Sequence, residues 1–84
     1  MKAITTKYHG PTNSRGSRII ATDEDGNRIS IGYPHGLSGI DCHAKAAVAL
    51  CRKMNWGGKL LGAGIKGGYV FVFTDSSEVY EVAK

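Results

Sequence analysis

The 84-residue chain has little of what membrane proteins, secreted scaffolds and helical bundles are built from. No apolar run approaches the roughly 18 residues of a membrane span, and the chain turns polar too soon after Met1 for a signal peptide. Proline and cysteine occur twice each, whereas the twelve glycines are about twice the usual share. We therefore expect a cytosolic protein with no membrane partner, built from short strands and tight turns.

The two cysteines are unsuited to a disulfide bond. Cys42 and Cys51 fall in one predicted helix, where nine residues correspond to about 13 Å and place the side chains on opposite sides. A bridge needs Cα atoms within about 7 Å. We therefore expect two reduced thiols, which agrees with a cytosolic setting.

Size and charge indicate one small basic domain. Eighty-four residues leave no room for a second core, and 42% hydrophobic with 21% charged residues is a globular composition. Residues 1–74, the predicted domain, hold ten basic and four acidic residues. Residues 75–84 hold three acidic residues and one lysine, and we expect this acidic tail to be an edge strand or disordered.

Three strands are predicted in the first half of the chain, over residues 2–9, 17–23 and 27–33. Residues 10–16 form a loop, and the Asp25-Gly26 pair supplies a hairpin turn. The third strand alternates between apolar and polar residues, which is typical of a half-buried strand. Its apolar face carries Ile29, Ile31 and Tyr33, and its polar face carries Arg28 and Ser30.

One helix is predicted over the alanine-rich residues 42–54, after a loop at residues 34–40. Asp41 or Ser38 is suited to cap its start, and it ends at Asn55 before two glycines. Its apolar stripe consists of Ala47, Leu50, Cys51 and Met54.

Two strands are predicted after the helix, over residues 59–65 and 69–74, joined by a glycine turn. The second of them is apolar at every position except its last, so we expect a central strand covered on both sides.

The order β-β-β-α-β-β predicts an α+β domain with a mainly antiparallel sheet and one helix packed on one face. One helix covers only one face well, so the other face is either solvated or binds something. The expected core consists of Ile4, Tyr8, Ile19, Ile29, Ile31, Leu50, Met54, Phe71 and Phe73.

The motifs that would indicate an enzyme or a cofactor lack their context. Residues 62–67 match the glycine pattern of a dinucleotide site, but a β-run follows where a helix is needed, which favours a glycine-rich hairpin. A Cys42 nucleophile would need an orienting partner and an oxyanion site, which nothing in the sequence places. The potential metal ligands show no paired short spacing; they are His9, His35, Cys42 and His43. We therefore expect a protein that is not an enzyme and has no cofactor and no metal.

The alternation of the first three strands places a basic patch on the outward face of the sheet. Lys7, Arg18 and Arg28 all point away from the isoleucine side, with Arg15 in the neighbouring loop. Such a face suits phosphates or carboxylates, or it is ordinary surface charge. Trp56 and Tyr69 are expected to be exposed near glycine turns, where they would act as partner anchors.

Six segments of the chain carry a resemblance to known proteins: residues 2–8, 10–12, 15–19, 25–27, 46–54 and 67–73. Through them the chain resembles, over about residues 1–73, a group of small proteins of bacterial phages, prophages and mobile elements. The resemblance implies a stoichiometric inhibitor of host defence, of which anti-CRISPR proteins are the best-known kind. It carries no catalytic motif and assigns no functional residue.

Two functional hypotheses follow. The first is a non-enzymatic anti-CRISPR-type inhibitor that blocks a host defence complex by docking on its surface. The basic body differs from acidic inhibitors that mimic DNA, so it would dock on an acidic surface of its target or near the nucleic acid bound to that target. The second is a nucleic-acid-binding module that places Lys7, Arg15, Arg18 and Arg28 on backbone phosphates. The sequence leaves the oligomeric state open, because a free strand edge can pair in a dimer.

Overall fold

Five strands and one helix follow one another in the order β-β-β-α-β-β, so the predicted α+β fold is confirmed. The computed structural model describes residues 3–37, 39–74, 80 and 82. The elements are β1 (Ala3–His9), β2 (Arg18–Asp23), β3 (Arg28–Gly32), α1 (Ile40–Met54), β4 (Leu60–Ile65) and β5 (Gly68–Phe73). Most of the acidic tail lies outside the described residues, so its prediction as an edge strand or disordered segment stays a prediction.

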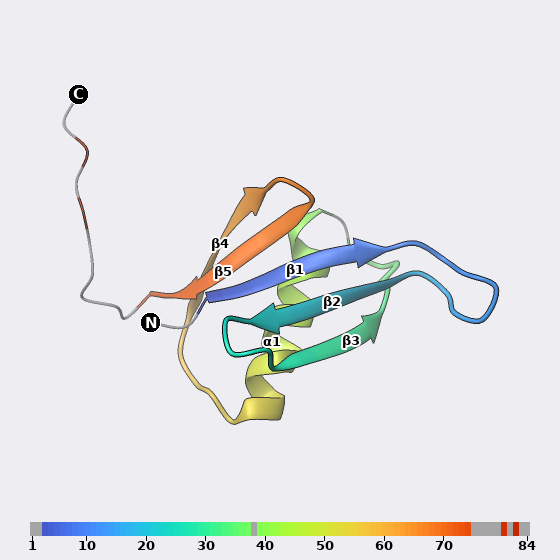
Figure 1. Ribbon diagram of the computed structural model, residues 1–84. Helices are drawn as coiled ribbons and strands as arrows, with labels where there is room; N and C mark the ends of the chain where they lie inside the picture. The colour runs from blue at the N-terminus through green and yellow to red at the C-terminus, as the bar shows by residue number, and fades with distance from the viewer. Residues whose placement is uncertain (1–2, 38, 75–79, 81, 83–84) are drawn as a thin grey trace.

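The strands form one sheet in the order β3-β2-β1-β5-β4, and every neighbouring pair is antiparallel. The first strand therefore lies at the centre, between β2 and the last strand β5 (Figure 1). At this position Ile4 of β1 lies opposite Asp23 on one side and Phe71 on the other. The two hairpins, β2–β3 and β4–β5, thus flank β1 and end at the two edges of the sheet.

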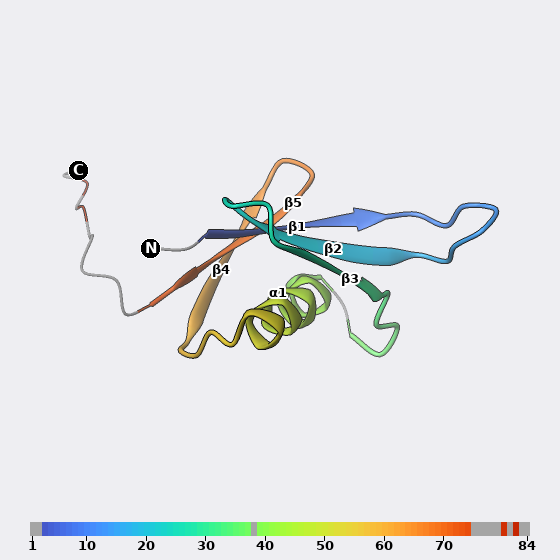
Figure 2. The ribbon, with the colours of Figure 1, turned by 60° about the horizontal axis from the view of Figure 1, so that its bottom comes forward.

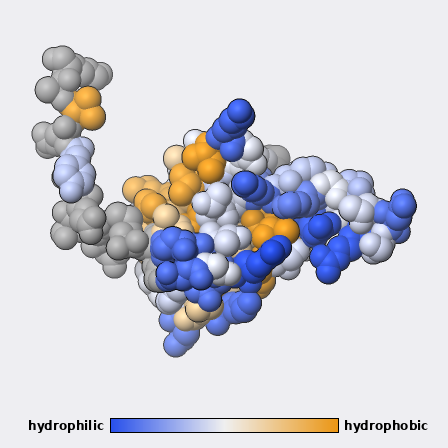
Figure 3. Space-filling view, in the orientation of Figure 1, coloured by the Kyte–Doolittle hydropathy of each residue, from blue (hydrophilic) through white to orange (hydrophobic). Residues whose placement is uncertain are grey.

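The helix packs across one face of the sheet, which gives the molecule two layers (Figure 2). The opposite face, called the open face below, is not covered by any element in the described part of the chain (Figures 1 and 3). Residues 69–74 were expected to be covered on both sides. That expectation is wrong, because β5 is internal to the sheet but has the helix on one side only.

The helix begins two residues earlier than predicted, at Ile40. Gly39 is its N-cap and makes no side-chain cap bond, so the cap predicted at Asp41 is wrong and Asp41 lies in the first turn, where its charge suits the helix dipole. Ser38, the other predicted cap, lies outside the described residues. The end of the helix is as predicted: Asn55 adopts the left-handed conformation with φ 60°, and its N–H bonds to the carbonyls of Arg52 and Cys51.

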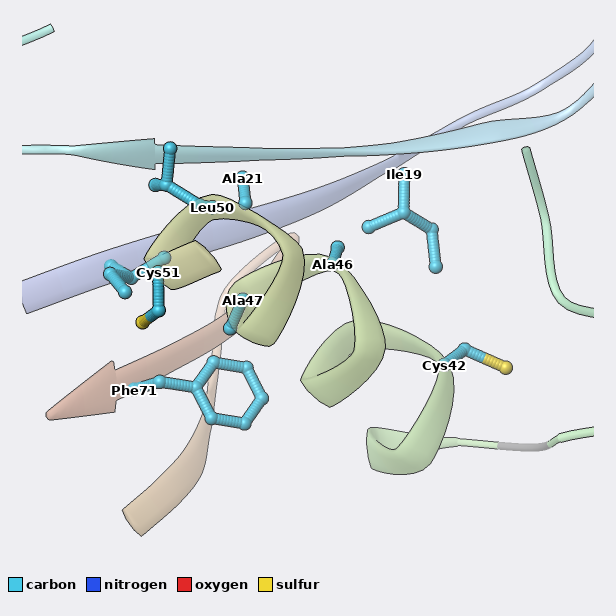
Figure 4. Packing of buried hydrophobic residues seen from close by; sticks show 9 residues of the cluster. Ile19, Ala21, Cys42, Ala46, Ala47, Leu50, Cys51 and Phe71 are labelled. Atoms are coloured by element: carbon cyan, nitrogen blue, oxygen red, sulfur yellow. The ribbon is translucent and has the colours of Figure 1, made fainter. Parts of the chain in front are cut away.

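The core lies between the helix and the sheet (Figure 4). Small side chains at Ala46 and Ala47 let the helix lie close to the strands, and Leu50 fills the space between them. The buried cluster consists of Ile4, Ile19, Ala21, Cys42, Ala46, Ala47, Leu50, Cys51 and Phe71. Cys42 and Cys51 are both free thiols, as expected, and occupy the two flanks of the buried stripe.

Most of the predicted core is confirmed, with Tyr8 as the exception. Ile29, Ile31, Met54 and Phe73 are partly buried and pack against the central cluster. Tyr8 lies on the helix side but is 50% exposed. It sits near the end of β1, where β1 and β2 continue past the helix (Figure 2). There its ring meets the ring of Tyr33 edge-on, with centroids 5.5 Å apart.

The glycine pattern at residues 62–67 forms a β-hairpin, as predicted, and opens no helix. Gly67 has φ 83° in the turn, a conformation that favours glycine. Gly68 follows at the start of β5, where an added Cβ would collide with the backbone carbonyl oxygen of Thr6. Glycine at this position therefore lets β5 approach β1, and this contact joins the β4–β5 hairpin to the rest of the sheet.

Candidate binding face

Three of the basic residues singled out in the sequence share the open face. Directly opposite residues of antiparallel strands project to the same face. Lys7 lies opposite Ile20, His9 opposite Arg18, and Arg28 opposite Thr22. The register therefore places Lys7, Arg18 and Arg28 together on the side away from the helix, as the alternation predicted.

A shallow depression of about 420 Å³ on this face is lined in part by Lys7 and Arg28. Ile20 lies within it and is only 9% exposed, although no element covers this face in the described part of the chain. Its long neighbours therefore fold over it, as lysine and arginine stems commonly do on apolar surface. The lining consists of Thr5, Lys7, His9, Ile20, Thr22, Asp23 and Arg28. We call the surface formed by β1, β2 and β3 on the open face the basic half.

Arg18 is the most enclosed cation of the basic half. Its Nε and Nη1 atoms are buried and have no hydrogen-bond partner among the described residues. Buried guanidinium nitrogens without acceptors are costly, because they give up water without a replacement. Rotation of Arg18 toward a carboxylate would thus break no hydrogen bond of these two atoms and would gain new ones.

The remaining part of the open face is apolar. Val70 lies opposite Thr5, and Ala63 lies opposite Val70, so the open face continues across β5 to β4. Leu61 is 62% exposed and Ile65 is 43% exposed. Figure 3 shows hydrophobic atoms gathered over β4 and β5, whereas hydrophilic atoms dominate over β1 to β3. We call Leu61, Ala63, Ile65, Val70 and Val72 the apolar half.

The apolar half was not predicted, because residues 59–65 were assigned no outward face and residues 69–74 were expected to be covered on both sides. The informative signal was the alternation of Leu61, Ala63 and Ile65 with Gly62 and Gly64. In β4, Leu61, Ala63 and Ile65 face the open side, whereas Leu60 and the two glycines face the helix side.

The other three predicted site residues lie away from the basic half. Arg15 is exposed in the loop that projects beyond β1 and β2 (Figure 1). Trp56 and Tyr69 were expected to be exposed, which is wrong: both are partly buried and pack against the core. Trp56 lines a cavity of about 360 Å³ beside the helix, and the Tyr69 ring lies on the helix side, 4.5 Å from the ring of His43.

A polar pair lies inside the core, between the helix and β1. Thr6 Oγ1 and His43 Nδ1 are hydrogen-bonded at 2.7 Å, and both residues are buried. Burial lowers the pKa of His43, because desolvation disfavours the charged imidazolium. His43 is therefore part of the packing between the helix and β1.

The thiols are enclosed in the same layer. Cys42 is buried, with its sulfur 3.7 Å from the carbonyl oxygen of Pro34. The hydrogen bond and charge of Cys42 raise the pKa of Tyr33 above its usual value. Burial raises the pKa of Cys51, because desolvation disfavours the thiolate.

The residues considered as metal ligands in the sequence do not gather into a group of three in the part of the chain that the structure describes. The group found there is Asp23, Glu24 and Asp25, at the β2–β3 turn. Asp23 Oδ1 accepts hydrogen bonds from the N–H groups of Asp25 and Asn27 at 2.9 and 2.8 Å. Its Oδ2 accepts one from Asn27 Nδ2 at 2.8 Å, so this carboxylate holds the turn.

Comparison of the chain with models of protein families, with curated proteins and with solved structures finds no match. Among the described residues, no helix has both the length and the apolar character needed to cross a membrane.

Proposed function

We propose that this protein is a non-enzymatic binding protein that docks through its open face on an acidic surface of another protein. The observation that carries the proposal is the junction of a basic half and an apolar half on one uncovered face of the sheet. Protein interfaces combine an apolar centre with charged groups that set orientation and partner choice.

The basic half supports an acidic partner in particular. Lys7 and Arg28 are exposed, and Arg18 holds two guanidinium nitrogens without acceptors in the described chain. Carboxylates are suited to arginine because they accept two parallel hydrogen bonds. Hydroxyl groups of Thr5, Thr22 and Ser30 accompany the cations on the same face and add neutral donors and acceptors.

The class of partner follows from the resemblance to proteins of phages and mobile elements. A chain of this size without a catalytic constellation would inhibit a host defence complex by occluding a surface. A CRISPR-type complex is therefore the first target to test, and the proposed mechanism is stoichiometric docking.

Nucleic-acid binding is the second candidate function. Lys7, Arg18 and Arg28 could contact backbone phosphates, and hydroxyls commonly accompany such contacts. Single-stranded nucleic acid also stacks on aromatic side chains. The register places the aromatic residues of β1 and β5 on the helix side, so these strands offer no stacking platform on the open face; they are Tyr8, Tyr69, Phe71 and Phe73. A protein partner therefore accounts for more of the open face.

The test is a charge reversal with a matched control. The variant Arg18→Glu/Arg28→Glu reverses two charges of the basic half, and the control Lys45→Glu/Arg52→Glu makes the same change on the exposed side of α1. Tagged proteins are added to purified CRISPR effector complexes, and bound protein and residual nuclease activity are measured. We expect binding and inhibition with the wild type and the control, and loss of both with the variant.

The two candidate functions separate in a second titration. Fluorescence polarisation with labelled DNA and RNA, from about 20 to 200 mM salt, detects phosphate binding by its steep salt dependence. Affinity that depends on Arg18 and Arg28 and falls steeply with salt would favour nucleic acid over the acidic protein surface. If the variant binds and inhibits as the wild type does, the open face is not the docking surface.

A further inference from the structure

The outer edge of β4 presents backbone groups without partners in the described chain. The Thr74 N–H donates to the carbonyl of Lys59 at 2.8 Å, which marks Lys59 as a residue that bonds toward β5. Antiparallel ladders alternate, so Leu61, Ala63 and Ile65 also bond toward β5. The N–H and C=O groups of Leu60, Gly62 and Gly64 therefore point outward, away from the sheet.

The opposite edge, β3, is protected. Hydrogen bonds from Tyr33 N–H to Ser17 O and from Asp23 N–H to Asn27 O, at 3.0 and 2.9 Å, orient the odd-numbered residues of β3 toward β2. The carbonyl of Arg28 thus faces outward, and the Lys53 Nζ atom from α1 donates to it at 2.8 Å. Charged side chains and prolines block strand addition, and β3 has Arg28 within it and Pro34 just after it.

We propose that β4 pairs antiparallel with β4 of a second copy of this chain, about a two-fold axis at Ala63 and perpendicular to the sheet. In this register Ala63 lies opposite Ala63 of the second copy, and Leu61 lies opposite its Ile65. The outward backbone groups of Gly62 and Gly64 then bond to each other across the seam. The pairing extends the sheet continuously and buries the two most exposed large side chains of the apolar half.

Charge favours a second copy at this edge over the other positions on the sheet. Each chain carries a net charge of +4, so self-association requires that the basic residues stay apart. With neighbouring strands about 4.8 Å apart, the two β2 strands of the dimer are about 34 Å from each other. This separation is several times the Debye length of about 8 Å at physiological salt. Antiparallel pairing also places neither Lys59 nor Lys66 opposite another lysine.

The dimer would enlarge the proposed docking face, but its formation does not depend on the proposed function. The two apolar halves meet at the seam, and the two basic halves lie on either side of it on one continuous face. Variants of the basic half leave the seam intact, so loss of target binding by Arg18→Glu/Arg28→Glu and loss of the dimer are separate observations.

A cysteine scan tests the register. The Ala63 pair across the seam is of the type without direct hydrogen bonds, in which the Cα atoms are about 4.5 Å apart, and this lies within the range for a disulfide. Ala63→Cys should give a disulfide-linked dimer under mild oxidation. Leu61→Cys is the matched control, because the two copies of that position would be about 13 Å apart. The wild type shows the background from the buried Cys42 and Cys51.

Sedimentation equilibrium tests the dimer itself. A single edge of six residues is small for an interface, so we expect a concentration-dependent dimer between about 10 μM and 1 mM. Ala63→Lys places like charges opposite each other and should weaken the dimer at least about tenfold. The control Ser30→Lys adds the same charge to the same face at the β3 edge, and it should leave the dimer affinity unchanged.

Three results would overturn the proposal. The first is a wild type that stays monomeric at about 1 mM, and the second is equal crosslinking of the Ala63→Cys and Leu61→Cys variants. The third is a monomeric protein whose target binding is abolished by Ala63→Lys but not by Ser30→Lys. This result would show that β4 pairs with a strand of the target and not with a second copy.

Discussion

The two hairpins that flank β1 use the same antiparallel geometry with opposite chemistry. In the β2–β3 hairpin, charged and hydroxyl side chains face the open side, and Lys53 occupies an outward carbonyl at its edge. In the β4–β5 hairpin, aliphatic side chains face the open side, and no hydrogen bond among the described residues reaches the outer edge of β4. Edge strands of natural sheets are usually protected by charge, proline or a covering element. The difference indicates that the β3 edge is built to stay free and that the β4 edge is built to be covered.

The largest effect is expected where the two hairpins are joined. Gly68→Ala places a Cβ against the Thr6 carbonyl oxygen, and the strands must separate to accommodate it. We expect the free energy of unfolding to fall by about 3 kcal/mol or more, measured by urea denaturation. Gly64→Ala is the control, because its Cβ would meet only Tyr69 Cε2 at 3.9 Å. Equal losses in the two variants would show that the β1–β5 contact is not the sensitive one.

A smaller loss is expected from the turn of the basic hairpin. Asp23→Ala removes the carboxylate that accepts from the N–H groups of Asp25 and Asn27 and from the Asn27 side chain. We expect the free energy of unfolding to fall by about 2 kcal/mol, because three partly buried N–H donors lose a charged acceptor. Amide exchange in β2 and β3 should accelerate more than in β4 and β5. Ser30→Ala, on the exposed side of the same hairpin, should change neither measurement.

The buried His43 makes stability depend on pH. Its pKa is lowered in the folded state, so the unfolded chain binds more protons once the pH falls below about 6.5. The stabilising contribution of neutral His43 is therefore fully present above that pH. The free energy of unfolding decreases as the pH falls toward the lowered folded-state pKa, by at most about 1.4 kcal/mol per pH unit. Urea midpoints between pH 8 and 5 measure it. A His43→Gln variant with the same slope over this range would assign the effect to other groups.

The smallest effect concerns the protected edge. Lys53→Met removes the amine that binds the Arg28 carbonyl but keeps an aliphatic side chain. We expect the free energy of unfolding to fall by less than about 1 kcal/mol, because the contact is exposed. Self-association should rise slightly, as a second edge becomes available for pairing. Lys45→Met, elsewhere on the exposed side of α1, removes the same charge; an equal rise there would point to net charge instead of edge protection.

Much of the fold was predictable from local pattern. Alternation in residues 27–33 identified a half-buried strand. Alternation in residues 17–23 and 27–33 correctly assigned Arg18 and Arg28 to one face, because the side-chain period of a strand is fixed at two. The end of the helix at Asn55 was predicted from the glycines after it, and the structure confirms it. Tyr8 was misplaced because periodicity assigns a face but does not reveal how far the helix extends along a strand.

The candidate face was predicted only in part. The basic half came from residues close in sequence, whereas the apolar half required knowing that β4 lies at an edge and that β5 is covered on one side. Trp56 and Tyr69 were expected to be exposed, but the helix and its following loop pack over that side of the sheet.

By itself the sequence determined the strands, the helix, the faces of the first three strands and the basic patch, since each of these depends on residues within a few positions of one another. Tertiary structure decided the strand order β3-β2-β1-β5-β4, and with it the contrast between the two edges. Lys53 protects the Arg28 carbonyl across 25 residues of chain, and β5 reaches β1 through the glycine at position 68. Such contacts join distant segments, so the energy of packing the whole sheet selects them and no local pattern of residues does.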